Sequence, residues 1–293
     1  MKTSVSSYSF YKYLIDTKCS YLEICDKAKE MGFDGIEFID LYNEKWGKTG
    51  DEFEMAREIK AHCEKIGLDI VSYTVVGQFL KDPKKELERL KVRVDIAKEL
   101  GVSLMRHDVT FELKDEPLYT YREAIEETYE YINELSNYAK SKGIKTCTEN
   151  HGFEFGASEI VEAVIKRVNN ENFGALVDIG NFACVDEDPV TATRNLAKYA
   201  FHVHVKDFIF KSGNELKPGG YWTVTTGGNY LRGTILGHGS IPVKTCLNAL
   251  KKAGYDGYVS LEYEGREENL SGIQDGLEYL KKVLHEIEKD GSI

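Results

Sequence analysis

The sequence lacks any run of apolar residues long enough to cross a membrane, which takes about 20 in succession. Residues 1–10 also lack the uninterrupted apolar core of a secretory signal peptide. The chain has six cysteines but no Cys-x-x-Cys pair, and several of them fall inside apolar segments. Buried, reduced thiols explain this pattern better than disulfides or a zinc knuckle. We therefore expect a cytoplasmic protein with no membrane partner.

Basic patches are missing as well. The 293 residues carry 38 Lys and Arg against 49 Asp and Glu, a formal net charge of −11, and no stripe concentrates the basic residues. Tight binding to a phosphate backbone depends on many Lys and Arg contacts. Nucleic acid is therefore not an expected partner. A Gly-rich phosphate cradle of the P-loop kind is also absent, so the sequence does not itself support a phosphorylated substrate.

One unit recurs along the chain: a charged amphipathic helix, then Gly, then a short apolar strand. Copies occur at residues 29–38, 64–72, 98–105, 140–147 and 251–260. A basic last turn followed by Gly suits a helix end, because Gly accepts the left-handed conformation and Lys offsets the helix dipole. The pattern predicts strands near 3–8, 34–39, 68–73, 102–107, 144–149, 173–178, 200–206 and 257–262. Helices are predicted near 20–31, 51–66, 83–100, 119–142, 156–169, 189–198, 242–253 and 267–288.

Alternating strands and helices imply a parallel sheet covered by helices. About eight such units in under 300 residues predict a (β/α)₈ TIM barrel of the α/β class. A doubly wound open sheet is the alternative, but no Gly-x-Gly-x-x-Gly follows the first strand. No linker or composition break divides the chain, so we expect a single domain over residues 1–293. The Gly-rich region 207–240 is predicted to be a functional lid or to have structure of its own.

Four predicted strands end in side chains that can bind a metal. Acidic groups at the end of an apolar strand are costly unless something pairs with them. In a TIM barrel, all four ends lie on the face that carries catalytic residues. Three carboxylates and one imidazole suit one divalent cation. These residues are Glu149, Asp178, His204 and Glu262.

Taken one at a time, the candidate site residues also have simpler explanations. Glu149 or Asp178 alone could close a salt bridge at the barrel rim. His202, two residues before His204, fits a hydrogen-bonded core histidine better than a ligand. His238, in a Gly-His-Gly-Ser turn, could be an ordinary loop residue. It is the four strand ends together that favour a metal site.

Several motifs carry a family resemblance: residues 149–152 (Glu-Asn-His-Gly), 177–181 (Val-Asp-Ile-Gly-Asn), 202–207 (His-Val-His-Val-Lys-Asp), 237–240 (Gly-His-Gly-Ser) and Glu262. Through them the chain resembles the sugar phosphate isomerase/epimerase superfamily, with its xylose isomerase-like TIM barrel, over nearly its whole length. The resemblance assigns the same four residues to one divalent metal ion (Mn, Mg, Co or Zn). It also gives Glu149 and Glu262 a second role, as acid and base on opposite faces of the substrate.

The motif after the sixth strand departs from the family pattern. Many epimerases of the family have Asp-x-x-His there, whereas this chain has Asn181 three residues after Asp178. The change weakens any transfer of substrate specificity and argues for one metal rather than several. Endonuclease IV, a relative with three metals, needs further histidines after earlier strands. The third strand here ends without one, so a nuclease is a weak alternative.

The resemblance implies a metal-dependent isomerase or epimerase that acts on a ketose or related polyol through an enediolate. The alternative is a metal-dependent lyase, such as a keto-inositol or dehydroshikimate dehydratase or a C-glycoside deglycosidase. His151 favours the lyase if it protonates a leaving group, because imidazole titrates near neutral pH. Equally, His151 could only orient Glu149. A non-catalytic sugar-binding barrel is less expected.

The expected partner is a small sugar or polyol, and a homo-oligomer is possible. Aromatic residues often stack on sugar rings, so Trp222 in the long loop, or Trp46, could form a platform. Either residue could equally seal a subunit contact. The residues predicted to bind substrate are Arg106, His107, Asn181, Lys206, Trp222 and His238.

Overall fold

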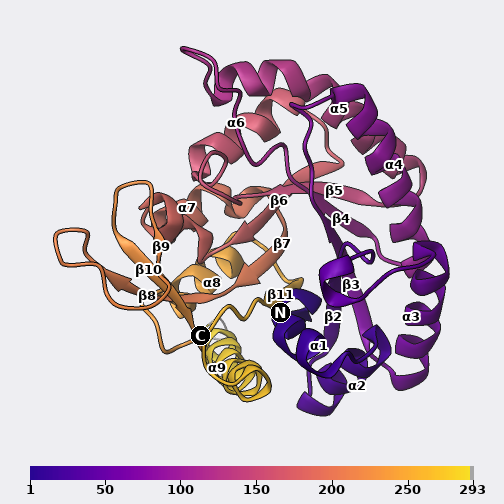
Figure 1. Ribbon diagram of the computed structural model, residues 1–293, viewed down its shortest axis with the longest axis vertical. Coiled ribbons are helices and arrows are strands. Elements are labelled where there is room, and N and C mark those ends of the chain that lie inside the picture. The colour runs from indigo at the N-terminus through magenta and orange to yellow at the C-terminus, as the bar shows by residue number, and fades with distance from the viewer. Residues whose placement is uncertain (291–293) are drawn as a thin grey trace.

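Eight parallel strands close into a barrel in the computed structural model, which describes residues 1–290 (Figure 1). Around the barrel the order is β1-β11-β7-β6-β5-β4-β3-β2, and the predicted (β/α)₈ fold is confirmed. Residues 291–293 of the predicted domain lie outside the described residues. The barrel strands are β1 (Lys2–Ser6), β2 (Gly35–Ile39), β3 (Asp69–Val75), β4 (Leu104–His107), β5 (Lys145–Glu149), β6 (Phe173–Asp178), β7 (Ala200–Val205) and β11 (Tyr258–Leu261).

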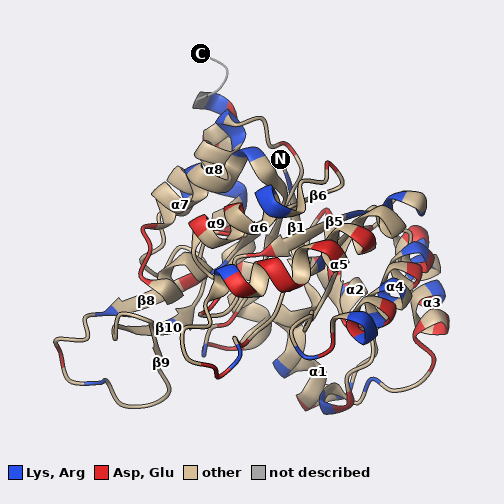
Figure 2. Cartoon of the chain, turned by 90° about the horizontal axis from the view of Figure 1, so that it is seen from above, with Lys and Arg blue, Asp and Glu red and all other residues tan. Residues whose placement is uncertain are grey.

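Helices surround the barrel on the outside (Figure 1). They are α1 (Tyr11–Thr17), α2 (Tyr21–Met31), α3 (Glu52–Ile66), α4 (Pro83–Leu100), α5 (Tyr121–Ser141), α6 (Ser158–Val168), α7 (Pro189–Leu196), α8 (Val243–Lys252) and α9 (Asn269–Asp290). Basic and acidic side chains both occur along the outer helices α3, α4 and α5 (Figure 2). No described helix combines the length and the apolar character needed to cross a membrane.

Helix α4 shows why the recurring unit folds as it does. The Asp82 carboxylate accepts the backbone N–H of Lys85 at 3.1 Å, and Pro83 occupies the first turn. Both features satisfy or remove backbone donors that a helix start leaves without partners. At the other end, Gly101 takes φ +82°, a conformation that costs little only for Gly. The chain then turns directly into β4.

Strand alternation divides the core into two regions. Side chains that point outward, such as Ile36, Val177 and Val203, have no exposed surface. Burying each of these side chains contributes about 1.5–3 kcal/mol. The inward-pointing side chains are largely polar, and Ser4 and Ser260 hydrogen-bond across β1 and β11 at 2.9 Å. The interior is therefore built for polar contacts as well as for packing.

The region at 207–240 has structure of its own. It contains β8 (Asp207–Lys211), β9 (Thr223–Val224) and β10 (Tyr230–Thr234), which form a small antiparallel sheet beside the barrel (Figure 1). The buried Asp207 carboxylate anchors the return to α8. It accepts backbone N–H groups from Phe208, Gly237, Gly239 and Ile241 at 2.9–3.0 Å.

Candidate active site

The four strand-end residues predicted to bind a metal converge at the carboxyl end of the barrel. Each offers one ligand atom, and these atoms all lie within 4.8 Å of one another. The strand register explains the convergence, because Asp178 of β6 is paired with His204 of β7. We call the set the ligand cluster: Glu149, Asp178, His204 and Glu262.

Asp178 is held by the turn that follows β6. Its Oδ1 accepts the backbone N–H groups of Gly180 at 2.8 Å and Asn181 at 3.2 Å. The Asn150 side chain braces the Asp178 backbone with two hydrogen bonds of 2.9 Å. Burial raises the pKa of Asp178 to about 6, although the nearby Lys206 opposes this shift. The carboxylate is thus rigid and fully desolvated, and it favours a cationic neighbour.

His204 presents its Nδ1 to the other ligands. This nitrogen has no hydrogen-bond partner within residues 1–290. It lies 3.4 Å from Oε1 of Glu262 and 3.7 Å from Oε1 of Glu149. Burial lowers the pKa of His204, but Glu37 and Glu262 outweigh it and raise the pKa well above its ordinary value. These carboxylates therefore attract positive charge to the site, whether a proton or a metal ion.

The donor set fits a divalent cation. A buried imidazole nitrogen without a partner and three buried or nearly buried carboxylates would be costly if nothing paired with them. Oxygen-rich sets of this kind suit harder cations such as Mg²⁺ and Mn²⁺, and an imidazole also suits Zn²⁺ or Co²⁺.

Lys206 brings a built-in positive charge to the cluster. Its Nζ lies 2.9 Å from Oδ2 of Asp178, 2.7 Å from Oε2 of Glu262 and 2.9 Å from Oε1 of Glu264. The Lys206 side chain is only 4% exposed. Burial lowers the pKa of Lys206, but these carboxylates outweigh it and raise the pKa well above its ordinary value. Lys206 is therefore an ammonium ion that partly neutralises the cluster.

A cavity of 380 Å³ opens onto the ligand cluster. We call it the active-site cavity. Aromatic, acidic and basic side chains share its wall, a mixture that can bind the hydroxyl groups and the ring face of a polyol. It is lined by Tyr8, Ile39, Asp40, Tyr42, Asn43, Thr74, Val76, Arg106, Glu149, His151, His204, Lys206, Glu262 and Glu264.

Arg106, Asp108 and His151 form a charged group beside Glu149. The Nη2 of Arg106 lies 2.6 Å from Oε2 of Glu149 and 2.9 Å from Oδ1 of Asp108. His151 Nδ1 lies 3.1 Å from the same Asp108 oxygen, and its side chain is 35% exposed. Burial lowers the pKa of His151, but the Asp108 carboxylate outweighs it, and the net shift is upward. A partly exposed, readily protonated imidazole therefore stands in the cavity wall.

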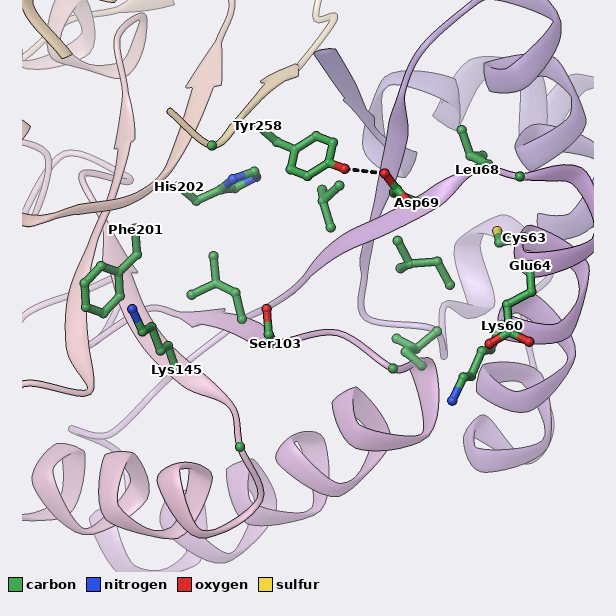
Figure 3. Close-up of a pocket in the computed structure, with 18 of the residues that line it drawn as sticks. Lys60, Cys63, Glu64, Leu68, Asp69, Ser103, Lys145, Phe201, His202 and Tyr258 are labelled. Carbon is green, nitrogen blue, oxygen red and sulfur yellow. Dashed lines mark hydrogen bonds between the residues drawn. The ribbon is translucent and has the colours of Figure 1, made fainter. Parts of the chain in front are cut away.

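A larger cavity, of 880 Å³, lies at the opposite end of the barrel (Figure 3). Asp69, Lys145 and Ala200, the first residues of β3, β5 and β7, are among its lining residues. No member of the ligand cluster lines it in the described chain. Because TIM barrels carry their chemistry at the carboxyl ends of the strands, the smaller cavity is the candidate active site.

The remaining predicted substrate residues divide into two groups. Arg106 and Lys206 line the active-site cavity, and Asn181 donates its Nδ2 hydrogen to Oε1 of Glu149 at 3.0 Å. The expectation for His107 needs correction. Its neighbour Arg106 takes the inward side of β4, so His107 points outward and lies between the rings of Phe79 and Phe173.

Trp222 and His238 are not among the described residues that line the active-site cavity. Trp222 packs beside Arg232 and donates its indole N–H to the carbonyl of Gly219 at 3.2 Å. His238 is exposed in the loop that Asp207 anchors. Trp46 is buried and packs 6.5 Å, between ring centroids, from Tyr8, which does line the cavity.

Comparison with known proteins agrees with this geometry. The family profile described as xylose isomerase-like TIM barrel matches residues 25–283. The chain belongs to this family. An inosose dehydratase of Mesomycoplasma hyopneumoniae (strain J) is 25% identical over 285 residues, which cover 90% of this chain and 89% of that protein.

Solved structures of other proteins share the fold. The IOLI protein with a bound zinc atom superposes with a TM-score of 0.75 at 18% identity, covering 98% of this chain and 99% of the other. An L-ribulose 3-epimerase superposes with a TM-score of 0.74 at 15% identity, covering 99% of this chain and 97% of the other. At these identities the likeness extends to the fold alone. The proteins bearing these names include both a lyase and an epimerase.

Some site residues of this xylose isomerase-like barrel escaped the sequence analysis. Asp108 immediately follows β4, and Glu37 lies in β2 on the inward side. Strand alternation could have indicated both, because Asp108 follows a predicted strand end and Glu37 interrupts an apolar strand. Tyr8 and Asp40 line the cavity from the first two strand-to-helix connections, where the sequence carries no distinctive motif.

Proposed function

We propose that this chain is a divalent-metal-dependent lyase that removes water from a cyclic polyol ketone of the inosose class. The observation that carries the proposal is that three members of the ligand cluster, Glu149, His204 and Glu262, line one cavity with His151, whose pKa is raised. Elimination of water requires an acid for the leaving hydroxyl, and the His151–Asp108 pair supplies one. Curated relatives named inosose dehydratase, 25% identical over most of the chain, support this choice over a simple isomerase.

Glu149, Asp178, His204 Nδ1 and Glu262 would hold the cation. A divalent ion bound by these groups polarises a substrate carbonyl and stabilises negative charge developing on its oxygen. Mn²⁺, Mg²⁺, Co²⁺ and Zn²⁺ are the candidates, with the oxygen-rich set favouring the harder ions. Arg106 and Lys206 contact Glu149 and Glu262, offset part of their negative charge and present cationic donors to substrate hydroxyls.

In the proposed reaction, a carboxylate removes the proton from the carbon next to the carbonyl. Glu149 and Glu262 are the two candidates for this base, because both line the cavity. The neighbouring C–O bond then breaks, and His151 transfers a proton to the departing hydroxyl, which leaves as water. A carbon–carbon double bond replaces the lost C–H and C–O bonds. No oxidant or reductant is needed.

Epimerisation or isomerisation of a ketose is the second candidate. It is favoured by the presence of two carboxylates, Glu149 and Glu262, whose Oε1 atoms lie 3.7 and 3.4 Å from the same His204 nitrogen. If one removes a proton and the other returns one, the substrate changes configuration without losing water. This reaction gives His151 no role as an acid.

The two functions are separated by incubating the metal-loaded protein with an inosose or a ketose in heavy water. A dehydratase produces an unsaturated ketone, detected by its ultraviolet absorption, together with one equivalent of water. An epimerase incorporates deuterium at carbon and produces a stereoisomer of unchanged hydration state. Deuterium incorporation with no unsaturated product from any inosose would reject the lyase in favour of the epimerase.

A further inference from the structure

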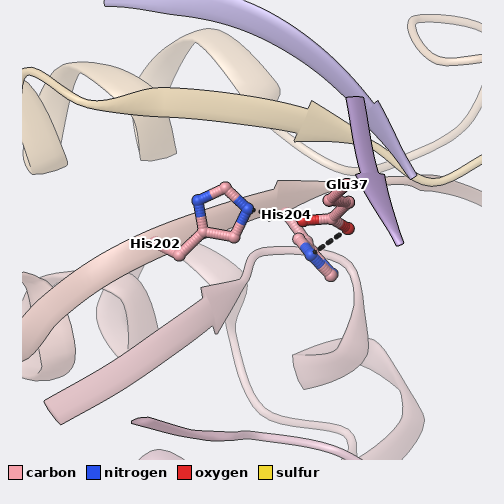
Figure 4. Close-up of side chains that lie close together, drawn as sticks. All are labelled: Glu37, His202 and His204. Atoms are coloured by element: carbon pink, nitrogen blue, oxygen red, sulfur yellow. Dashed lines mark hydrogen bonds and ion pairs between the residues drawn. The ribbon is translucent and has the colours of Figure 1, made fainter. Parts of the chain in front are cut away.

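Glu37 is a fully buried carboxylate inside the barrel and is not among the described residues that line the active-site cavity. It projects from β2 toward β7, which lies three strands away around the barrel. Figure 4 shows its carboxylate facing the imidazole rings of His202 and His204. The Nε2 atoms of these two rings lie 2.7 Å from Oε2 and Oε1 of Glu37, respectively. Ser72 donates its hydroxyl to Oε2 at 2.8 Å.

A carboxylate in this position constrains its neighbours. Ionised Glu can only accept hydrogen bonds, so each facing nitrogen must carry a hydrogen. The carboxylate is fully buried between two imidazole nitrogens and the Ser72 hydroxyl, an arrangement that suits an acceptor of hydrogen bonds. When a cation takes the place of a proton on Nδ1, the one remaining ring hydrogen of His204 lies on Nε2, where it faces Glu37.

The other ring nitrogen points at the ligand cluster. Nδ1 of His204 lies 3.7 Å from Oε1 of Glu149 and 3.4 Å from Oε1 of Glu262. Nε2, on one edge of the ring, thus meets the Glu37 carboxylate, and Nδ1, on the other edge, meets the candidate cation site. A carboxylate behind a ligating imidazole selects its tautomer, fixes its orientation and raises its basicity.

We propose that Glu37 is a positioning residue of the metal centre, which holds His204 as the Nε2–H tautomer with Nδ1 toward the cation. This inference rests on the metal site of the proposed function. His202 and Ser72 act one step further away, by fixing the Glu37 carboxylate through its other oxygen. The group formed by Glu37, His202 and His204 is then a support for the ligand cluster and not a second metal site.

The test is calorimetric binding of Mn²⁺ alone to the full chain and to Glu37→Gln. The amide is nearly isosteric, but it carries no charge and must present an N–H₂ group to one of the two imidazoles. We expect Mn²⁺ affinity to fall by about 10–100-fold, the usual effect of losing such a partner. The matched control is Ser4→Ala, which removes the buried Ser4–Ser260 hydrogen bond inside the same barrel without touching the cluster. Its Mn²⁺ affinity should equal that of the unaltered chain.

The outcomes separate this inference from the proposed function. Equal Mn²⁺ affinity in Glu37→Gln and the unaltered chain would overturn the role of Glu37 and leave the metal site standing. An unaltered chain that binds no divalent ion would overturn both. If Ser4→Ala weakened Mn²⁺ binding as much as Glu37→Gln does, the positioning role would be overturned, because a general loss of packing would then explain the effect.

A second measurement needs no substitution and so cannot fail through misfolding. Nitrogen-15 NMR of histidine-labelled protein loaded with diamagnetic Zn²⁺ reports which ring nitrogen carries the hydrogen. We expect His204 to show a protonated Nε2 and a metal-shifted Nδ1. A hydrogen on Nδ1, or metal on Nε2, would contradict the proposed role of Glu37.

Discussion

The ammonium group of Lys206 lies 2.9 Å from Oδ2 of Asp178, one of the residues of the candidate metal site. Both side chains are almost completely buried, and Lys206 also contacts Glu262 at 2.7 Å. The cluster therefore has an internal cation of its own. Because this charge offsets part of the carboxylate repulsion, the fold does not depend on a metal ion alone to neutralise the site.

Chelation should consequently abolish activity without unfolding the protein. Lys206 stays paired with Asp178 and Glu262 when the divalent ion is removed, so the far-ultraviolet circular dichroism should be unchanged. Adding Mn²⁺ at about 100 times its Kd should then raise the free energy of unfolding by about 2.7 kcal/mol. Denaturant titration with and without metal measures this difference. Unfolding on chelation alone would contradict the role given to Lys206.

Replacing Lys206 with Met should make stability depend on metal. Removing one partner of a buried ion pair typically costs 3–5 kcal/mol, because the remaining charge is left without compensation. We expect a loss of about this size in metal-free protein and a partial recovery with Mn²⁺. The control is Lys198→Met, an exposed lysine 3.2 Å from Glu162, for which the expected change is below about 1 kcal/mol. Similar losses in both variants would argue against a special role for Lys206.

Glu149→Gln and Glu262→Gln test the proposed proton transfer at carbon. Loss of a general base typically lowers the rate by about 10²–10⁴-fold. We expect a drop of this size in the exchange of substrate hydrogen with heavy water in at least one of the two variants. Mn²⁺ content, measured in parallel, separates a lost base from a lost ligand. Glu171→Gln, at a carboxylate that is 82% exposed, should exchange at the unaltered rate. Full exchange in both active-site variants would refute the assignment.

His151 should govern the alkaline side of the pH–rate profile. Asp108 outweighs burial and raises the pKa of His151 above its usual 6.5, which favours the acid form. As pH rises through the raised pKa, the proton donor is lost and kcat for dehydration should fall. His151→Gln should lower kcat by about 10²–10⁴-fold and remove the fall in kcat on the alkaline side of the profile. Asp108→Asn should shift this fall in kcat to lower pH. A fall at unchanged pH would exclude the His151–Asp108 pair as the acid.

His107 should contribute to the loss of folding stability at acidic pH. Burial lowers its pKa from 6.5 to about 4, so the unfolded chain binds this proton more tightly than the folded protein. Stability should therefore fall as pH drops from 6.5 toward 4, by an amount on the order of 3 kcal/mol. His107→Phe, which keeps a ring between Phe79 and Phe173, should show a shallower fall. His285→Gln removes an exposed imidazole and should match the unaltered slope. Parallel curves for all three proteins would contradict this prediction.

The barrel and the four residues of the ligand cluster were predictable because both follow from local patterns. Strand 144–149 was expected and Lys145–Glu149 is observed, so Glu149 takes its predicted place at the strand end. Alternation with period two puts Glu149 and the other strand-end residues on one face of the barrel. The same rule shows why Arg106 and His107, as neighbours in β4, could not both reach the cavity. The sequence does not say which of the two points inward.

The sequence by itself determined the order of strands and helices and the charged groups at the strand ends, because these depend on spacing along the chain. Only the closed barrel decided which groups meet across its interior. Glu37 and His202 are 165 residues apart, yet they lie 2.7 Å from each other because β2 and β7 face one another inside the barrel. The insertion of Lys206 between Asp178 and Glu262 likewise depends on strand stagger and burial. Such contacts have no local signature, since they arise when the sheet closes.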